Sequence, residues 1–209
     1  MIIAVDGPAA SGKGTISKRL AKHYGLRHLD TGRTYRAVAK AMMEAGTPFD
    51  DVAGAIKVAR ELDFGSLSDP SLVAPEYGEG ASRIAVLADL RVVLVARQKA
   101  FAQNADPGAV LDGRDIGTVV CPEAALKLYV TASVEERARR RSLEVYGVET
   151  GERYDALLSS LRVRDERDAS RAASPLRPAE DAHIIDTTRM TIDEAVNAAS
   201  RLVEVRLTA

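Results

Sequence analysis

Gly7-Pro8-Ala9-Ala10-Ser11-Gly12-Lys13-Gly14-Thr15 is the stretch that decides the fold of this 209-residue chain. It directly follows the apolar run 1–5 and precedes the helical spacing of Ile16, Leu20 and Tyr24. The glycines let the backbone turn tightly enough to aim successive N–H groups at phosphate oxygens, and the helix behind them adds a favourable dipole. Lys13 adds a mobile cation. Strand, glycine-rich turn, lysine and helix together predict a phosphate-binding loop.

Gly14 departs from the general pattern of such loops. Ser or Thr normally follows the lysine and gives its hydroxyl to a magnesium ion, whereas here Thr15 comes one residue later. Whether Thr15 ligates a metal ion directly is therefore open from the loop sequence alone.

A dinucleotide-binding turn is the competing interpretation of the same residues. Gly12-Lys13-Gly14 could open its fingerprint, with Asp30 about where a ribose-binding acid would lie. The third glycine is missing because Ser17 occupies its place. A lysine inside the turn is also better explained by the free β- and γ-phosphates of a nucleotide than by the pyrophosphate of a dinucleotide, which lies against the backbone. A phosphotransferase is therefore favoured.

Length and composition indicate a single domain that can bury a substantial core. The chain is 46% hydrophobic, and its 29 basic and 30 acidic side chains leave a net charge of -1, so no global field recruits nucleic acid or an anionic membrane. Its only cysteine, Cys121, cannot form an internal disulfide, and no signal segment precedes the first strand. No apolar stretch approaches the ~20 residues that cross a bilayer. We expect a cytoplasmic monomer that binds neither nucleic acid nor membrane.

Short apolar runs alternate with helical patterns along the whole chain. This order predicts an α/β fold, a parallel sheet with helices on both faces. The five predicted strands cover residues 2–6, 27–30, 109–112, 126–131 and 182–186. Ligands collect at the carboxyl ends of such strands, so Asp30, Asp112 and Asp186, which end three of them, are expected near the phosphate loop.

Nearly eighty residues separate the second and third strands, far more than a crossover helix needs. Within them, residues 35–43, 52–62 and 84–102 have separate helical patterns. We therefore predict an inserted subdomain over residues 31–108, with residues 64–80 as its least regular part.

Two motifs at strand ends carry candidate ligands. Arg36, early in the helix after the second strand, could fork onto a phosphate, or it could be an exposed basic residue of a capped helix. Asp112 ends the third strand, which is where the partner of a magnesium ion or of its water shell is expected after a phosphate loop.

Two later helices are rich in arginine. Arg137, Arg140 and Arg141 face roughly one way and could neutralise a transferring phosphoryl group, although basic runs are usually solvated. A second helix carries Arg164, Arg167, Asp168 and Arg171 on one face. Intrahelical ion pairs contribute only ~0.2 to 0.5 kcal/mol each, too little to explain so dense a cluster, so a polar ligand is favoured.

Taken together, these motifs resemble the bacterial cytidylate kinases, which transfer the γ-phosphoryl group of ATP to CMP or dCMP in pyrimidine nucleotide metabolism. The resemblance spans nearly the whole chain. It rests on Asp6-Gly7-Pro8 with Gly12-Lys13-Gly14-Thr15, on Asp30-Thr31-Gly32 with Tyr35-Arg36, on the run from Asp112 to Val120, and on Arg164-Asp165-Glu166-Arg167-Asp168 with Arg171. Gly-Lys-Gly-Thr is common in nucleoside monophosphate kinases, so the resemblance also accounts for Gly14.

The resemblance implies a P-loop kinase fold over residues 1–209, with sheet order 2-3-1-4-5. Residues 31–108 would be the monophosphate-binding subdomain and residues 142–155 a short lid. The implied cofactor is Mg²⁺, with ATP as phosphoryl donor. Larger members of the family carry a longer, strand-containing insertion, so the structure of the short segment 64–80 is left open.

The resemblance also implies roles for individual residues. ATP would be bound by Gly7, Pro8, Ala9, Ala10, Ser11, Gly12, Lys13, Gly14 and Thr15. The monophosphate would be bound by Thr31, Tyr35, Arg36, Ser82, Arg91, Gly113, Arg114, Asp115, Arg164, Asp168 and Arg171. The catalytic residues would be Lys13, Arg114, Arg137 and Arg140, and the metal would be held by Thr15 and Asp112, partly through water.

Within the monophosphate set, the implied contacts divide by the part of the nucleotide. Arg36, Arg114 and Arg171 would hold the phosphate, Arg164 with Asp168 the sugar, and Ser82, Arg91 and Asp115 the cytosine. A carboxylate can accept a hydrogen bond from the exocyclic amine that uracil lacks, so discrimination against UMP is expected. The acceptor is already anionic, so alignment and charge neutralisation should suffice without a strong general base.

Two other functions remain as alternatives. A shikimate or adenylate kinase type would share the phosphate loop but not Asp115 and the cluster from Arg164 to Arg171. A non-catalytic nucleotide switch is the other, although the chain lacks an Asn-Lys-x-Asp guanine signature. For a kinase, we expect the insertion and the lid to close over both nucleotides and exclude water.

Overall fold

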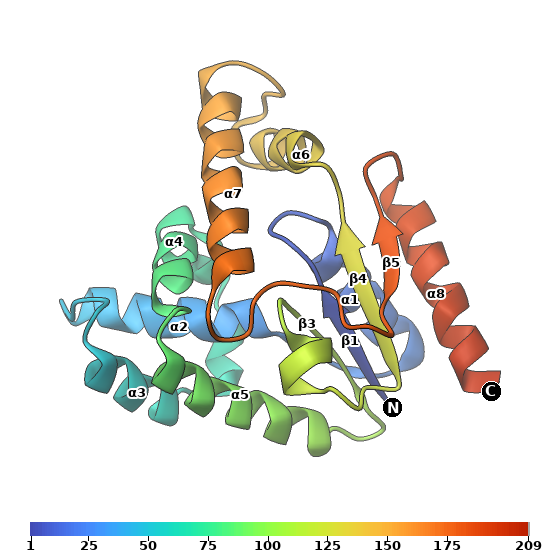
Figure 1. Cartoon of the computed structure of the whole chain (residues 1–209), viewed down its shortest axis with the longest axis horizontal. Coiled ribbons are helices and arrows are strands. Elements are labelled where there is room, and N and C mark those ends of the chain that lie inside the picture. Colours follow the sequence, from blue (N-terminus) through green and yellow to red (C-terminus); the bar gives the residue numbers. More distant parts are fainter. Residues whose placement is uncertain (209) are drawn as a thin grey trace. The chain divides into compact units, whose positions relative to one another are not determined.

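The computed structural model of this chain describes residues 1–208 and contains one five-stranded parallel sheet in the order β2-β3-β1-β4-β5 (Figure 1). The strands are β1 (Ile2–Asp6), β2 (Arg27–Asp30), β3 (Ala109–Gly113), β4 (Leu126–Thr131) and β5 (His183–Asp186). The predicted strands and sheet order are confirmed, with β3 one residue longer and β5 one residue shorter than expected. The first residues of β1 and β3 pair in register, Ile2 opposite Ala109.

The chain folds into two compact units. One contains residues 1–29 and the chain from residue 105 onward, and the other contains residues 30–104. Apart from Asp30, the second unit lies within the residues 31–108 that were predicted as an insertion.

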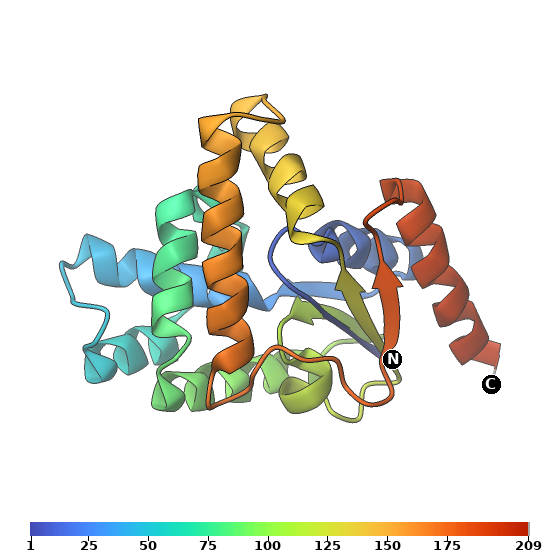
Figure 2. The same ribbon diagram turned by 45° about the horizontal axis from the view of Figure 1, so that its top comes forward.

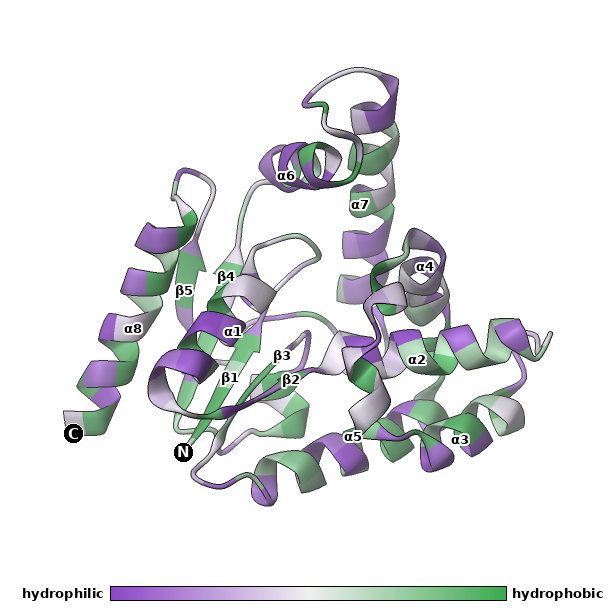
Figure 3. Cartoon of the chain, turned by 180° about the vertical axis from the view of Figure 1, so that it is seen from behind, coloured by the Kyte–Doolittle hydropathy of each residue, from purple (hydrophilic) through white to green (hydrophobic). Residues whose placement is uncertain are grey.

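The first unit packs around the apolar strands. α1 (Lys13–Tyr24) and α8 (Ile192–Thr208) cover one face of the sheet, and the short π-helix η3 (Ile116–Val120) lies on the other (Figures 1 and 3). The strand β1 is mostly hydrophobic in Figure 3, whereas α8 alternates along its length, as a helix with one buried face should. The core of this unit consists of Ile3, Val5, Ile16, Leu20, Ala21, Val110, Leu126, Leu128, Val130, Ile185, Ala195, Ala199 and Val203.

The helices α6 (Val134–Tyr146) and α7 (Glu152–Ser170) run side by side in the same unit (Figure 2). Ala138 of α6, Leu161 of α7 and Ala9 of the phosphate loop form a small buried cluster. The two helices are therefore anchored on the loop after β1. The predicted lid, residues 142–155, consists of the end of α6, the loop that joins α6 to α7 and the first turn of α7.

The second unit is helical, with α2 (Thr31–Glu44), α3 (Val52–Glu61), α4 (Pro75–Ile84) and α5 (Ala88–Gln103). Two short 3-10 helices, η1 (Phe64–Ser68) and η2 (Pro70–Val73), lie between α3 and α4. The core comprises Tyr35, Val38, Ala39, Met42, Ala55, Ala59, Ala81, Ile84, Ala85, Leu90 and Leu94.

The helix α4 was not predicted, because its first half lies in the segment 64–80 that was expected to be irregular. Gly78 and Gly80 lower its intrinsic helix propensity. Pro75 at the first helical position favours a helix start, and burial of Ala81 and Ile84 supplies the packing that local propensity lacks. None of the helices described in residues 1–208 is long and apolar enough to cross a bilayer.

Gly7 gives the turn after β1 its shape. Its φ is +152°, and a Cβ added there would lie 2.0 Å from the backbone oxygen of Val130. Gly14, in the first turn of α1, has no such restriction, because a Cβ there would lie 3.8 Å from Asp112 Oδ2, an ordinary distance.

Gly7→Ala should therefore lower the free energy of unfolding by at least about 2 kcal/mol, because the methyl group overlaps fixed backbone in an unfavourable conformation. Gly14→Ala is the matched control and should stay within about 0.5 kcal/mol of the wild type. Urea unfolding followed by circular dichroism measures both. Equal stability of the two variants would contradict this account of the turn.

Candidate active site

The phosphate loop ends at the start of α1 in a form that suits an anion. Gly12 precedes the helix in a left-handed conformation, and no side chain caps the helix there. The first turn contains no acidic residue, so the positive end of the helix dipole is not neutralised by a side chain of that turn. Lys13 Nζ donates to the carbonyl oxygen of Pro8 at 3.0 Å, which holds the ammonium group over the loop.

Asp6, the last residue of β1, bridges two loops at the end of the sheet. Its Oδ1 accepts from the N–H of Ile116 and its Oδ2 from the N–H of Gly117, both at 2.8 Å. Burial raises the pKa of Asp6 to about 6, against the lowering effect of these two bonds and of Lys13. The negative charge of Asp115 raises the pKa of Asp6 further, so the two carboxylates lie close enough to repel each other.

Asp112 lies beside the phosphate loop, as its place at the end of β3 predicted. Its side chain is buried, Oδ1 lies 2.7 Å from His28 Nε2, and Oδ2 lies near Gly14. The other two acids at strand ends have local roles. Asp30 accepts from Arg33 N as the N-cap of α2, and Asp186 accepts from Thr188 N.

Asp112 and Thr15 suit a magnesium ion that is bound mainly through phosphate oxygens and water. In residues 1–208 no three His, Cys, Asp or Glu side chains gather into a metal cage. Magnesium at kinase sites needs only one or two protein groups besides phosphates and water. The buried carboxylate of Asp112 and the exposed hydroxyl residue Thr15, on the helix that begins at the loop, fit that limited role.

The arginine cluster predicted around Asp168 is present. Arg114 Nε donates to Asp168 Oδ2 at 2.8 Å, and Arg171 Nε donates to the Asp168 carbonyl oxygen at 3.3 Å. Burial alone would raise the pKa of Asp168, but the charges of Arg114, Arg164 and Arg171 outweigh it and lower the pKa. The structure thus brings four predicted ligands together, namely Arg164 and Asp168 of α7, Arg114 directly after β3 and Arg171 directly after α7.

Arg137 joins α6 to the phosphate loop and to α7. This buried guanidinium donates from Nη1 to the Ala9 carbonyl oxygen at 3.1 Å and from Nε to the Ala132 carbonyl oxygen at 2.9 Å. Its Nη2 also pairs with Asp165 Oδ2 at 2.6 Å. Arg137 therefore places a positive charge beside the loop in a fixed orientation.

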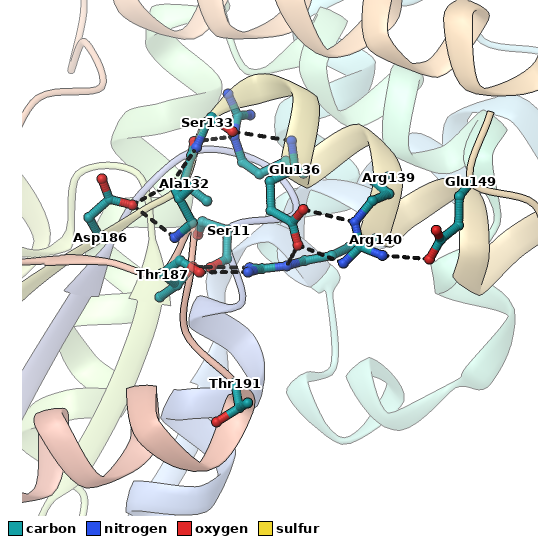
Figure 4. A network of polar contacts seen from close by, with 12 residues as sticks. Ser11, Ala132, Ser133, Glu136, Arg139, Arg140, Glu149, Asp186, Thr187 and Thr191 are labelled. Atoms are coloured by element: carbon teal, nitrogen blue, oxygen red, sulfur yellow. Dashed lines mark hydrogen bonds and ion pairs between the residues drawn. The ribbon is translucent and has the colours of Figure 1, made fainter. Parts of the chain in front are cut away.

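Arg140 reaches the same loop through Thr187, the residue after β5 (Figure 4). Its Nη1 donates to Thr187 Oγ1 at 3.0 Å and its Nη2 to the Thr187 carbonyl oxygen at 2.6 Å. Thr187 Oγ1 in turn donates to the Ser11 carbonyl oxygen at 3.1 Å. Glu136 accepts hydrogen bonds from both Arg139 and Arg140. These bonds lower the pKa of Glu136, and the bond from Arg139 has the larger effect.

The predicted ligands in the unit of residues 30–104 lie on three helices. In α2, Thr31 and Tyr35 are buried and Arg36 is partly buried. Ser82 of α4 and Arg91 of α5 are buried, at 3% and 4% exposure. The Arg91 guanidinium carbon lies 5.6 Å from the centre of the Tyr35 ring, and its Nη1 donates to the Ala85 carbonyl oxygen at 3.3 Å. Arg91 is thus a buried arginine that lies close to another of the predicted ligands.

Several residues in the network were missed by reasoning from the sequence. Asp6 belongs to the motif Asp6-Gly7-Pro8, but no separate role was predicted for it. Its position at the end of a strand, directly before the loop, is the signal that could have identified it. Asp165 belongs to the motif of residues 164–168, but its partner Arg137 is 28 residues away in the chain. His28 and Thr187 gave no signal, because their partners Asp112 and Arg140 are 84 and 47 residues away.

Comparisons with known proteins find relatives over nearly the whole length of this chain. The family model described as "Cytidylate kinase" matches residues 3–205. The cytidylate kinase of Rhizobium meliloti strain 1021 is 56% identical over 206 residues, covering 99% of this chain and 97% of its own. That of Agrobacterium fabrum strain C58 is 55% identical over 205 residues, covering 98% and 97%. Among solved structures, shikimate kinase from Bacteroides thetaiotaomicron is similar in fold, with 13% identity, a TM-score of 0.53 and 98% coverage of each chain.

Asp6→Asn should destabilise the protein, and more strongly as the pH falls. An asparagine side chain has only one oxygen, so its amide nitrogen would face one of the two backbone N–H groups that the carboxylate accepts, and that N–H group would lose its acceptor. Because the pKa of Asp6 is raised from 3.8 to about 6, its protonation stabilises the folded state, and that contribution is lost as the pH rises through 6. The difference in unfolding free energy between wild type and variant should widen by about 1 kcal/mol from pH 7.5 to pH 5.

Urea unfolding of both proteins at the two pH values measures this difference. Comparison with the variant cancels the titration of the other carboxylates. A difference that narrows as the pH falls would show that the pKa of Asp6 is not raised.

Proposed function

This chain belongs to the cytidylate kinase family, and from that premise we propose that it transfers the γ-phosphoryl group of ATP to CMP or dCMP, giving ADP with CDP or dCDP. The observation that carries the proposal is relatedness over nearly the whole length, at 56% identity to a cytidylate kinase. The predicted donor loop and the arginine clusters all lie within the matched residues 3–205.

On the donor side, the phosphate loop, residues 7–15, binds the phosphates of ATP through its backbone N–H groups, which all of these residues except Pro8 carry, and through the ammonium group of Lys13. Thr15 and Asp112 would hold Mg²⁺, partly through water, and the ion would supply positive charge that neutralises the phosphates of ATP. Lys13 exchanges its bond to the Pro8 carbonyl oxygen for one to a phosphate oxygen, which is favoured because the new acceptor is charged.

On the acceptor side, the proposed ligands divide by the part of the nucleotide that they bind. Arg36, Arg114 and Arg171 bind the phosphate of the monophosphate, and Arg164 with Asp168 binds its sugar. Ser82, Arg91 and Asp115 bind the cytosine, and Thr31, Tyr35 and Gly113 complete the set. Residues 31–108 act as the monophosphate-binding subdomain and residues 142–155 as the lid.

The chemistry needs charge neutralisation more than proton transfer. An oxygen of the acceptor phosphate attacks the γ-phosphorus, and the bond from that phosphorus to the bridging oxygen of ADP breaks. The attacking oxygen is already anionic, so no general base has to remove a proton. Arg137 and Arg140, fixed beside the loop by Ala9 and Thr187, supply positive charge where the transferring group becomes more negative.

A substrate panel tests the proposed function directly. With ATP and Mg²⁺, CMP and dCMP should be phosphorylated in preference to UMP, AMP and shikimate, as measured by coupled ADP release. Lys13→Ala should abolish transfer while its thermal unfolding midpoint stays close to that of the wild type. Preference for AMP or shikimate, or nucleotide binding without turnover, would refute the assignment.

Thr187→Val should weaken the use of ATP more than that of CMP. The valine keeps the shape of the side chain but removes the hydroxyl that links Arg140 to the Ser11 carbonyl oxygen. Loss of these bonds corresponds to about a tenfold rise in the KM for ATP. Thr187→Ser keeps the hydroxyl and is the matched control. Identical kinetics of the two variants would mean that the Thr187 hydroxyl does not position the loop.

A further inference from the structure

We propose that Gly78 of α4 and the segment formed by η1 and η2 are positioning elements for Arg36. This inference rests on the proposed function, in which Arg36 binds the phosphate of the monophosphate. The segment formed by η1 and η2, residues 64–73, belongs to the stretch 64–80 whose structure the sequence left open. It follows α3 and passes beside α2, and its backbone oxygens point to the basic side chains of α2.

The orientation of Arg36 is set by backbone oxygens. Its Nη1 donates to the carbonyl oxygen of Leu72 at 2.9 Å and lies 3.5 Å from that of Ala74. Leu72 lies in η2, and Ala74 is the single residue between η2 and α4. A guanidinium group is planar, so bonds at one nitrogen restrict the directions in which its other N–H groups point.

Gly78 provides the space that the guanidinium group occupies. A Cβ at this position would lie 3.2 Å from Arg36 Nη2, 3.3 Å from Nη1 and 3.4 Å from Cζ. Gly78 lies inside α4 and has no positive φ, so the backbone conformation there does not require glycine. A glycine inside a helix lowers stability relative to alanine. Close approach of the arginine accounts for a glycine that helix formation does not need.

Two neighbouring basic side chains fix the segment to α2. Arg33 Nη1 donates to the Leu67 carbonyl oxygen at 2.6 Å, and Lys40 Nζ donates to Asp69 Oδ2 at 2.6 Å and to Ser71 Oγ at 2.9 Å. With Arg36 they follow the spacing i, i+3, i+7, which places all three on one face of α2. The bond from Lys40 lowers the pKa of Asp69 to about 2, so the pair stays ionised at neutral pH.

A fixed guanidinium group has a direct advantage for binding a phosphate. Arginine recognises phosphate through parallel N–H bonds, which requires its plane to face the oxygens. A side chain that is already oriented loses less conformational freedom when the ligand arrives. Moving Arg36 by a few tenths of an ångström should therefore weaken the binding of the acceptor monophosphate without altering the binding of ATP.

Gly78→Ala is the variant that tests the proposal. The added methyl group displaces the end of a flexible side chain, so the protein should fold with an unchanged or higher thermal midpoint. We expect the KM for CMP to rise about tenfold while the KM for ATP stays within twofold. Glu76→Ala changes an exposed residue of the same helix to alanine and should leave both KM values unchanged. In an Arg36→Ala background, Gly78→Ala should have no further effect on the KM for CMP.

Asp69→Asn gives a second, independent test. The asparagine can still accept from Ser71 N but no longer pairs with the charge of Lys40. The KM for CMP should again rise with that for ATP unchanged. An unchanged or lower KM for CMP in both variants would overturn the proposal, and a lower value would mean that the carbonyl oxygens compete with the phosphate for Arg36. If the wild-type protein does not phosphorylate CMP at all, the proposed function fails instead, and the two failures are thereby distinguished.

Discussion

The carboxylate of Asp6 is the constraint on which the site in the first unit depends. It ends the central strand β1, directly before the phosphate loop, and accepts the N–H groups of Ile116 and Gly117 with both oxygens. Those N–H groups belong to the first residues of η3, directly after Arg114 and Asp115. One buried side chain therefore fixes the start of the phosphate loop and the start of η3 to each other. The N–H groups of Ile116 and Gly117 must keep their positions, because a buried carboxylate needs its hydrogen-bond donors.

Positive charge is placed around the phosphate loop by bonds to fixed backbone. Arg137 binds the Ala9 carbonyl oxygen, and Arg140 binds Thr187, whose hydroxyl binds the Ser11 carbonyl oxygen. Each guanidinium group also has an acidic partner, Asp165 or Glu136, which compensates the cost of holding the charge there. Such a site needs little rearrangement when charge develops on a transferring phosphoryl group, because its dipoles and charges already have their directions.

The same design recurs in the unit of residues 30–104. Arg36 is oriented by the carbonyl oxygens of Leu72 and Ala74, and a glycine in α4 leaves the room that the guanidinium group fills. In both units an arginine is directed by main-chain oxygens, which belong to the folded scaffold and do not change with side-chain rotamers. The short segment that seemed merely irregular in the sequence supplies the oxygens in this unit.

Local sequence patterns were enough to establish the phosphate loop, the five strands and three of the four helices of the second unit, because periodicity and turn residues act over a few neighbouring positions. The sheet order and the individual ligands came from resemblance to a family and not from spacing. Packing of the whole chain was needed for α4, which forms because Ala81 and Ile84 are buried despite two glycines. It was also needed for the pairings of Asp6 with Ile116 and of Thr187 with Ser11, across 110 and 176 residues. Local patterns carry no information about such distant partners, since only the packed chain brings their donors and acceptors together.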